Sequence, residues 1–96
     1  MTHNIRPDLV EYVKLIDSFV NDHIATSEFE RRYLRLVKDD TTIHGEPAFG
    51  IIDGLFFHVD EYFDDPDYTD HQRQQAVDNL RNHAREALVA LTNVSN

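Results

Sequence analysis

The side chains with the clearest capacity for chemistry are the carboxylates of residues 60–70, named here the acidic segment. Carboxylates can transfer protons, hold a metal ion or pair with the basic side chains of another protein. The acidic segment contains no lysine or arginine of its own. Its six acids are Asp60, Glu61, Asp64, Asp65, Asp67 and Asp70.

Catalytic roles have little support in the sequence. Two carboxylates act as acid and base only in a pocket that separates their pKa values, whereas these acids crowd around Pro66, where a helix must end. The chain has no cysteine, none of its three serines stands in a nucleophile motif, and its three glycines form no phosphate-binding loop. We therefore expect no enzymatic activity, no catalytic residue and no cofactor.

Metal binding is the second possibility. The acids around Pro66 lack the central glycine and terminal glutamate of a calcium loop. His58 with Glu61, and His83 with Glu86, stand three residues apart and share a helix face, but such pairs are common on surfaces without a metal. We expect no metal site. The other histidines, expected in solvated loops or at caps, are His3, His23, His44 and His71.

The charge of the chain is concentrated in the acidic segment. With 18 acidic and 9 basic residues the formal net charge is −9, and the six acids of this segment account for two-thirds of it. Such a surface repels phosphate and anionic lipid, so we expect no direct binding to nucleic acid or membrane. A basic protein is the expected partner. Without an apolar signal core, a membrane-length apolar run or a cysteine, the chain is expected in the cytoplasm.

Four amphipathic segments must position these residues. Apolar side chains recur at helical spacing near residues 7–22, 27–38, 47–64 and 70–91, without sustained strand alternation. Ser27 with Glu30 has the spacing of a capping box. Short connections between such helices predict an all-α fold, a compact antiparallel four-helix bundle, with residues 1–96 as one domain.

The predicted third helix places four acids where folding disfavours them. Asp60, Glu61, Asp64 and Asp65 fall in its last turns, at the negative end of the helix dipole, where each costs about 0.3–1 kcal/mol. The other two acids precede the fourth helix and suit N-terminal capping. These four acids destabilise the helix and have no structural role in the sequence pattern, which favours a binding surface. Simple solubility is the alternative.

Aromatic residues are interleaved with the acids. Tyr62 and Phe63 fall on the same apolar stripe as Val59, so both rings are expected to be buried. Tyr68 lies outside this stripe and is a candidate ring for contact with a partner. Interleaved rings contribute little to solubility, which again favours a binding surface.

Residues 19–88 also carry a set of short motifs. One helix end leads into a turn and helix as FVNDHIATSEFERRY, and a later helix reads IIDGLFFHVDEY before an Asp-Pro turn at 65–66. In the last helix an acid precedes Leu-Arg, here Asp78, Leu80 and Arg81. In these motifs the chain resembles the colicin D-type immunity proteins and the related immunity proteins of contact-dependent growth inhibition systems. It departs from them at Phe63, where a cysteine often follows the tyrosine.

The resemblance implies a small all-α protein that protects a cell from a nuclease toxin made by its kin. Colicin D-like toxins cut the anticodon loop of tRNA, so their active site must be basic. The acidic segment would cover that site by imitating phosphates, with the protein expected as a monomer bound one-to-one to the toxin. A helical adaptor for another basic protein is the alternative. The candidate toxin-binding residues are Asp60, Glu61, Asp64, Asp65, Asp67 and Tyr68.

Overall fold

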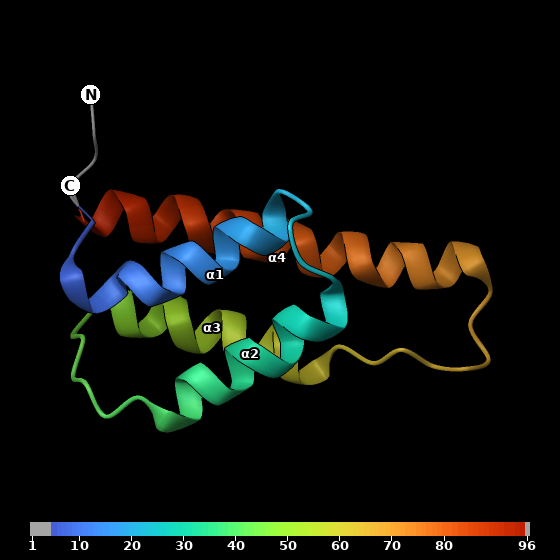
Figure 1. Ribbon diagram of the computed structural model, residues 1–96, viewed down its shortest axis with the longest axis horizontal. Coiled ribbons are helices and arrows are strands. Elements are labelled where there is room, and N and C mark those ends of the chain that lie inside the picture. Colours follow the sequence, from blue (N-terminus) through green and yellow to red (C-terminus); the bar gives the residue numbers. More distant parts are fainter. Residues whose placement is uncertain (1–4, 96) are drawn as a thin grey trace.

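The computed structural model describes residues 5–95, and every regular element within that range is a helix. A short 3-10 helix, η1 (Pro7–Leu9), leads into α1 (Val10–Val20), and α2 (Thr26–Asp39), α3 (Ala48–Glu61) and α4 (Asp70–Ser95) follow. Consecutive helices run in alternating directions along the long axis (Figure 1), and α1 and α3 each pack against both α2 and α4. The predicted all-α fold of four helices is confirmed.

A stacked pair of rings lies in the core. Phe19 from α1 and Phe29 from α2 stack with ring centroids 4.3 Å apart, and Tyr33 packs beside Phe29 at 5.5 Å. The Tyr33 hydroxyl donates to the carbonyl oxygen of Ile52 over 2.8 Å, which ties α2 to α3 and satisfies a buried polar group. All four residues belong to the apolar stripes, so helical periodicity identified these core positions.

Residues of two separate sequence motifs meet between α1 and α4. The guanidinium of Arg81 lies over the Phe19 ring, 5.2 Å from its centroid, and donates to Asp22 Oδ1 over 2.7 Å. Asp78, one turn earlier on α4, stands 3.8 Å from the same guanidinium. These contacts hold α4 against the end of α1, so these motif residues stabilise the fold.

His44 anchors the loop between α2 and α3, at the end of the bundle away from the acidic segment (Figure 1). The prediction that it is solvated is wrong, because its side chain is only 4% exposed. Nδ1 lies 2.8 Å from Asp8 Oδ2, and Nε2 lies 2.6 Å from Asp40 Oδ2. The hydroxyl of Tyr12 also donates to Asp40, at 2.5 Å. Two carboxylates on opposite sides of the ring therefore offset the cost of burying it.

The helix α3 ends at Glu61, three residues earlier than predicted. Tyr62 is already extended, with φ −62° and ψ 130°, and the chain runs as a loop over residues 62–69. Side chains of an extended backbone alternate between opposite sides, so Tyr62 turns inward while Phe63 turns out and is 62% exposed. The expectation that Phe63 is buried is wrong for this reason.

Two helix starts differ in their capping. At α2 the N-cap is Ala25, without a side-chain cap, so the expected capping box of Ser27 and Glu30 is wrong. A reciprocal capping box instead begins α4: the amide of Gln72 donates to Thr69 Oγ1 at 3.1 Å, and the amide of Thr69 donates to Gln72 Oε1 at 2.9 Å. Thr69, rather than the neighbouring acids, therefore caps the fourth helix.

Candidate binding surface

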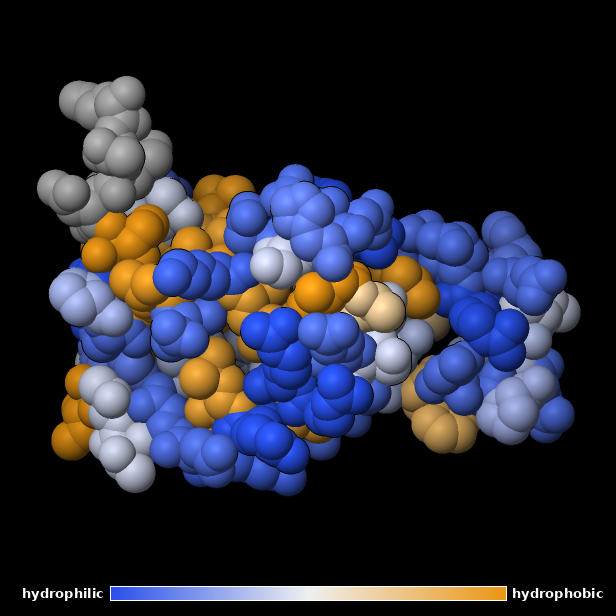
Figure 2. Space-filling view, viewed as in Figure 1, coloured by the Kyte–Doolittle hydropathy of each residue, from blue (hydrophilic) through white to orange (hydrophobic). Residues whose placement is uncertain are grey.

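The acidic segment lies at a projecting end of the molecule. The loop 62–69 and the first turns of α4 extend beyond the other three helices (Figure 1), and this end is largely hydrophilic in the space-filling view (Figure 2). Of the candidate residues, Asp60 and Glu61 occupy the last turn of α3, and the others lie in the loop. Only Asp65 and Tyr68 are half-buried; the exposed ones are Asp60, Glu61, Asp64 and Asp67.

Arg73 on α4 pairs with one of these acids. Its Nε donates to Asp64 Oδ1 at 2.6 Å, and Nη2 donates to the carbonyl oxygen of Asp65 at 3.4 Å. Asp70 stands 3.6 Å from Nη1 of the same guanidinium. The hydrogen bond that Arg73 donates to Asp64 raises the pKa of Arg73, so this cation is fixed at the edge of the acidic segment. Sequence reasoning missed it, although its position three residues after Asp70 was a visible signal.

Asp65 has a local structural role. Its Oδ1 accepts the amide of Asp67 at 2.9 Å, and its carbonyl oxygen accepts the amide of Tyr68 at 3.0 Å. These bonds close the turn around Pro66 and set the position of Tyr68. The Asp65 carboxylate is thus engaged in shaping the loop.

Three candidate acids have no such role. Within residues 5–95, no lysine, arginine or histidine forms an ion pair with Asp60, Glu61 or Asp67. Glu30 on α2 lies within reach of this charge, since burial and then the charge of Asp60 raise the pKa of Glu30. Sequence reasoning missed Glu30, which lies far from the acidic segment along the chain. The uncompensated charge is therefore centred on the end of α3.

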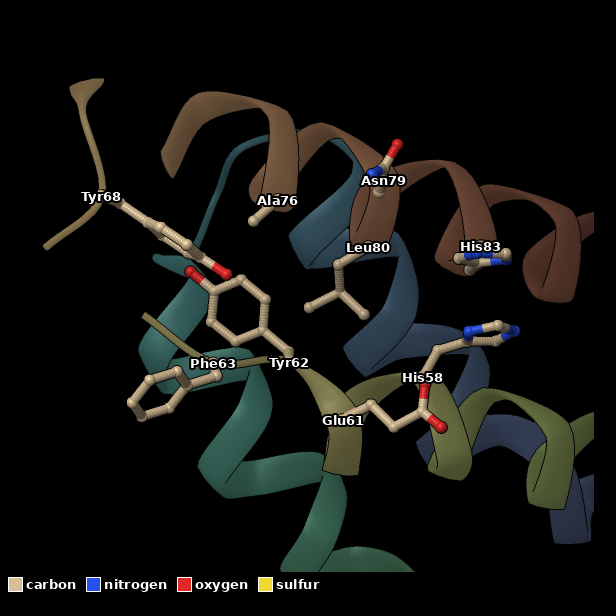
Figure 3. A pocket seen from close by; sticks show the side chains of 9 residues that line it. All are labelled: His58, Glu61, Tyr62, Phe63, Tyr68, Ala76, Asn79, Leu80 and His83. Atoms are coloured by element: carbon tan, nitrogen blue, oxygen red, sulfur yellow. The ribbon is translucent and has the colours of Figure 1, made fainter. Parts of the chain in front are cut away.

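A groove of about 250 Å³ opens beside these acids, between the end of α3, the loop and α4 (Figure 3). Tyr62 and Tyr68 lie at one end with their hydroxyls close to each other, whereas the carboxylate of Glu61 points toward His58 (Figure 3). Burial, then the nearby charges of Asp64 and Glu30, raises the pKa of Tyr62, so its hydroxyl stays protonated.

Two stacked histidines close the far end of the groove. His58 from α3 and His83 from α4 lie with ring centroids 3.4 Å apart and an interplanar angle of 8° (Figure 3). Glu86 is 3.6 Å from His83 Nδ1. The fold thus brings together the two histidine–glutamate pairs noted in the sequence. Even so, no three acid or histidine side chains of the described chain are arranged to hold a metal ion.

The fold and this surface define a small helical protein with an acidic, projecting end. The family model described as bacterial self-protective colicin-like immunity matches residues 8–91, so the chain belongs to that family. The description of that family refers to bacterial self-protection against a colicin-like toxin. No solved structure matches the chain. No helix in the described range is both long and apolar enough to cross a membrane.

A second likeness concerns plant enzymes. Three mitochondrial regulatory subunits of NAD-dependent isocitrate dehydrogenase from Arabidopsis thaliana, subunits 1, 2 and 3, are each 36% identical to the chain over 56 residues. The aligned stretch covers 58% of this chain and 15% of each plant subunit. Because the chain spans so small a part of these relatives, the likeness carries no function to it.

Proposed function

We propose that the protein neutralises a toxin. This toxin is a nuclease of the tRNA-cleaving, colicin D-like class, and the acidic segment covers its basic active site. The protein acts by occlusion in the cytoplasm, without catalysis, as one immunity molecule on one toxin domain. The observation that carries this proposal is the group of exposed acids Asp60, Glu61 and Asp67, which have no basic partner within the described chain.

Charge complementarity is the physical reason for this choice of partner. An enzyme that cleaves RNA holds phosphates with lysine and arginine, and carboxylates can accept the same charge-assisted hydrogen bonds. Opposite charge also steers the encounter, toward association rates of about 10⁸–10⁹ M⁻¹s⁻¹ at low salt. Fast capture is valuable because every free toxin molecule is a catalyst.

Tyr68 adds an aromatic ring to the proposed imitation of RNA, in which carboxylates already imitate phosphates. Single-stranded nucleic acid is held by a basic track together with aromatic stacking of its bases. The turn closed by Asp65 holds Tyr68 beside the acids, partly exposed. In the proposed complex its ring takes the place of a stacked base, while the unpaired acids Asp60, Glu61 and Asp67 take the places of phosphates.

Other surfaces fit a basic active site less well. The groove between α1 and α2 contains the bases Lys14, Arg32 and Arg35 together with the acids Glu11 and Asp39. Such mixed charge repels part of any basic surface. The acidic end is therefore the better candidate.

The test uses a colicin D-like toxin domain, identified by its binding to this protein, with tRNA as substrate. We expect one equivalent of the immunity protein to abolish tRNA cleavage, and a non-cleavable tRNA to compete with it for the toxin. A stable ternary complex of toxin, tRNA and immunity protein would exclude occlusion of the active site. If the toxin domain acts on another target, the assignment to tRNA is wrong. The remaining hypothesis is then a helical adaptor that binds another basic protein.

A further inference from the structure

The groove beside the acidic segment has a shape and chemistry suited to one kind of side chain. We propose that it receives a single arginine of the partner protein, whose guanidinium lies against the rings of Tyr62 and Tyr68 and pairs with Glu61. The inference rests on the proposed function, which supplies a basic partner. It goes further by naming the anchoring residue type and the place where it binds.

The size of the groove indicates a side chain rather than a small molecule. Its volume of about 250 Å³ lies below the roughly 300–1,000 Å³ of pockets that hold drug-sized ligands. Ala76 contributes only a methyl group to the wall on α4, and Leu80 contributes an apolar floor (Figure 3). Phe63 points away from the other ring residues and is largely exposed, so it does not fill the space. One long, thin side chain fits this groove.

The walls of the groove favour a guanidinium over an ammonium group. Two tyrosine rings line one end of the groove, the exposed Glu61 borders it with a carboxylate that points toward His58 (Figure 3), and neither lysine nor arginine lines it. A guanidinium is flat, stacks on aromatic faces and pairs with a carboxylate through two parallel donors. Lysine offers a compact, strongly hydrated charge that gains less from rings. The groove should therefore discriminate between the two bases.

Arg73 provides an internal example of the same recognition. Its guanidinium reaches one carboxylate oxygen of Asp64 and the carbonyl oxygen of Asp65, near Tyr62. The loop 62–69 is thus already shaped to accept a guanidinium. The groove beside it is lined by rings and an acid, and by no lysine or arginine.

The groove and the surrounding acids then have different tasks. Binding energy in protein complexes concentrates in a few anchors, among which arginine and tyrosine are enriched, whereas exposed charges mainly set the association rate. Asp60 and Asp67 lie outside the groove lining and would act through long-range attraction. Glu61 and Tyr68 would contact the anchoring arginine directly.

Two peptides of equal charge separate these tasks. Hexa-arginine and hexa-lysine are titrated against the full chain, and 15N-labelled protein locates the binding site by NMR. We expect the wild type to prefer hexa-arginine by about threefold to tenfold, with shifts at Glu61, Tyr62 and Tyr68. Tyr68→Leu should remove this preference without changing the affinity for hexa-lysine, whereas Tyr68→Phe should keep it. Asp67→Asn, the charge control, should weaken both peptides equally.

A second variant fills the groove without removing a ring or a charge. Ala76→Leu keeps a strong helix former on α4 and should also abolish the preference for arginine, provided that circular dichroism shows an unchanged fold. Equal affinity of the wild type for the two peptides would overturn the inference, as would a preference that survives both Tyr68→Leu and Ala76→Leu. If the preference is absent while the toxin is still neutralised through the acids, the groove inference fails and the proposed function stands. If the preference for hexa-arginine is present but neutralising the acids leaves the affinity for the toxin unchanged, the proposed function fails instead.

Discussion

The Nε atom of Arg73 donates a 2.6 Å hydrogen bond to Oδ1 of Asp64, which joins the projecting part of α4 to the acidic loop. Both side chains are accessible to water, at 38% and 58% exposure, so dissolved salt screens their attraction. Asp64 is consequently a structural residue as well as a candidate toxin contact. Binding and stability therefore have to be tested on different carboxylates of the acidic segment.

The Asp64–Arg73 pair should make a small contribution to stability that depends on salt. Asp64→Asn and Arg73→Gln should each lower Tm slightly at low ionic strength, and the double variant should lose no more than either single change. The losses should fade as ionic strength rises. Thermal melts at low and high salt measure this. A loss that is independent of salt would show that Asp64 acts through something other than this pair.

The start of α4 should depend on Thr69 more than on Asp70. Thr69→Ala removes the hydroxyl that accepts the Gln72 amide and should cost about 1 kcal/mol in the free energy of unfolding. Asp70→Ala should cost less than half of that. The Asp70 side chain is fully exposed, and its contact with Arg73 is long, at 3.6 Å, so this ion pair contributes little. Urea unfolding of both variants provides the comparison. The reverse order would show that the acid is the effective cap.

The network around His44 should give stability an upper pH limit. Burial alone would lower the pKa of His44, but the hydrogen bonds to Asp8 and Asp40 outweigh it and raise that pKa. A raised histidine pKa stabilises the fold below about pH 6.5, and this contribution is lost as the pH climbs through the folded-state value. The free energy of unfolding should therefore decline above about pH 6.5, by no more than about 1.4 kcal/mol per pH unit for one proton.

The two acids of this network set the lower limit. The hydrogen bond to His44 lowers the pKa of Asp8; at Asp40 burial acts upward, but the hydrogen bonds from Tyr12 and His44 prevail and lower the pKa. Their contribution should be complete above about pH 4 and disappear as the pH falls through the depressed values. Urea melts of the wild type and His44→Gln across this range test both limits. A decline above pH 6.5 that persists unchanged in His44→Gln would contradict this assignment.

The sequence predicted what depends on local periodicity and missed what depends on distant contacts. The apolar stripes located four helices and core residues such as Phe19 and Tyr33, because a helix must bury its apolar face. The burial of His44 was not predictable in this way, since Asp8 lies 36 residues from it. The early end of α3 was missed because Tyr62 and Phe63 continue the stripe although the backbone does not. The capping box of Thr69 and Gln72 was readable but went unrecognised.

At the candidate site, too, the sequence predicted the local features and missed those that depend on contacts between distant residues. The concentration of acids was evident from composition, and the acids remain together at one end of the fold. Arg73 and Glu30, which change the local charge, come from other helices and needed the packing to be seen. The groove likewise requires side chains from α3, the loop and α4 at once.

Association with the toxin should be strongly salt-dependent. Two-thirds of the net charge lies in the acidic segment, so long-range attraction should accelerate the encounter at low ionic strength. Stopped-flow measurements should show the association rate falling steeply toward and beyond ~0.15 M salt, where the Debye length is about 8 Å, with a smaller change in dissociation. A rate that ignores salt would mean that this segment does not steer binding.

The most direct test of the account compares two double variants that remove the same charges from different places. Asp60→Asn with Glu61→Gln neutralises unpaired acids at the end of α3, and Asp39→Asn with Glu11→Gln is the matched control in the groove between α1 and α2. The first pair should leave the free energy of unfolding unchanged or raise it by up to about 1 kcal/mol, because both acids lie at the negative end of a helix dipole. The same pair should weaken toxin binding at least about tenfold, or 1.4 kcal/mol, while the control changes the affinity far less. If both double variants bind the toxin as the wild type does, or weaken binding equally, the acidic end is not the inhibitory surface.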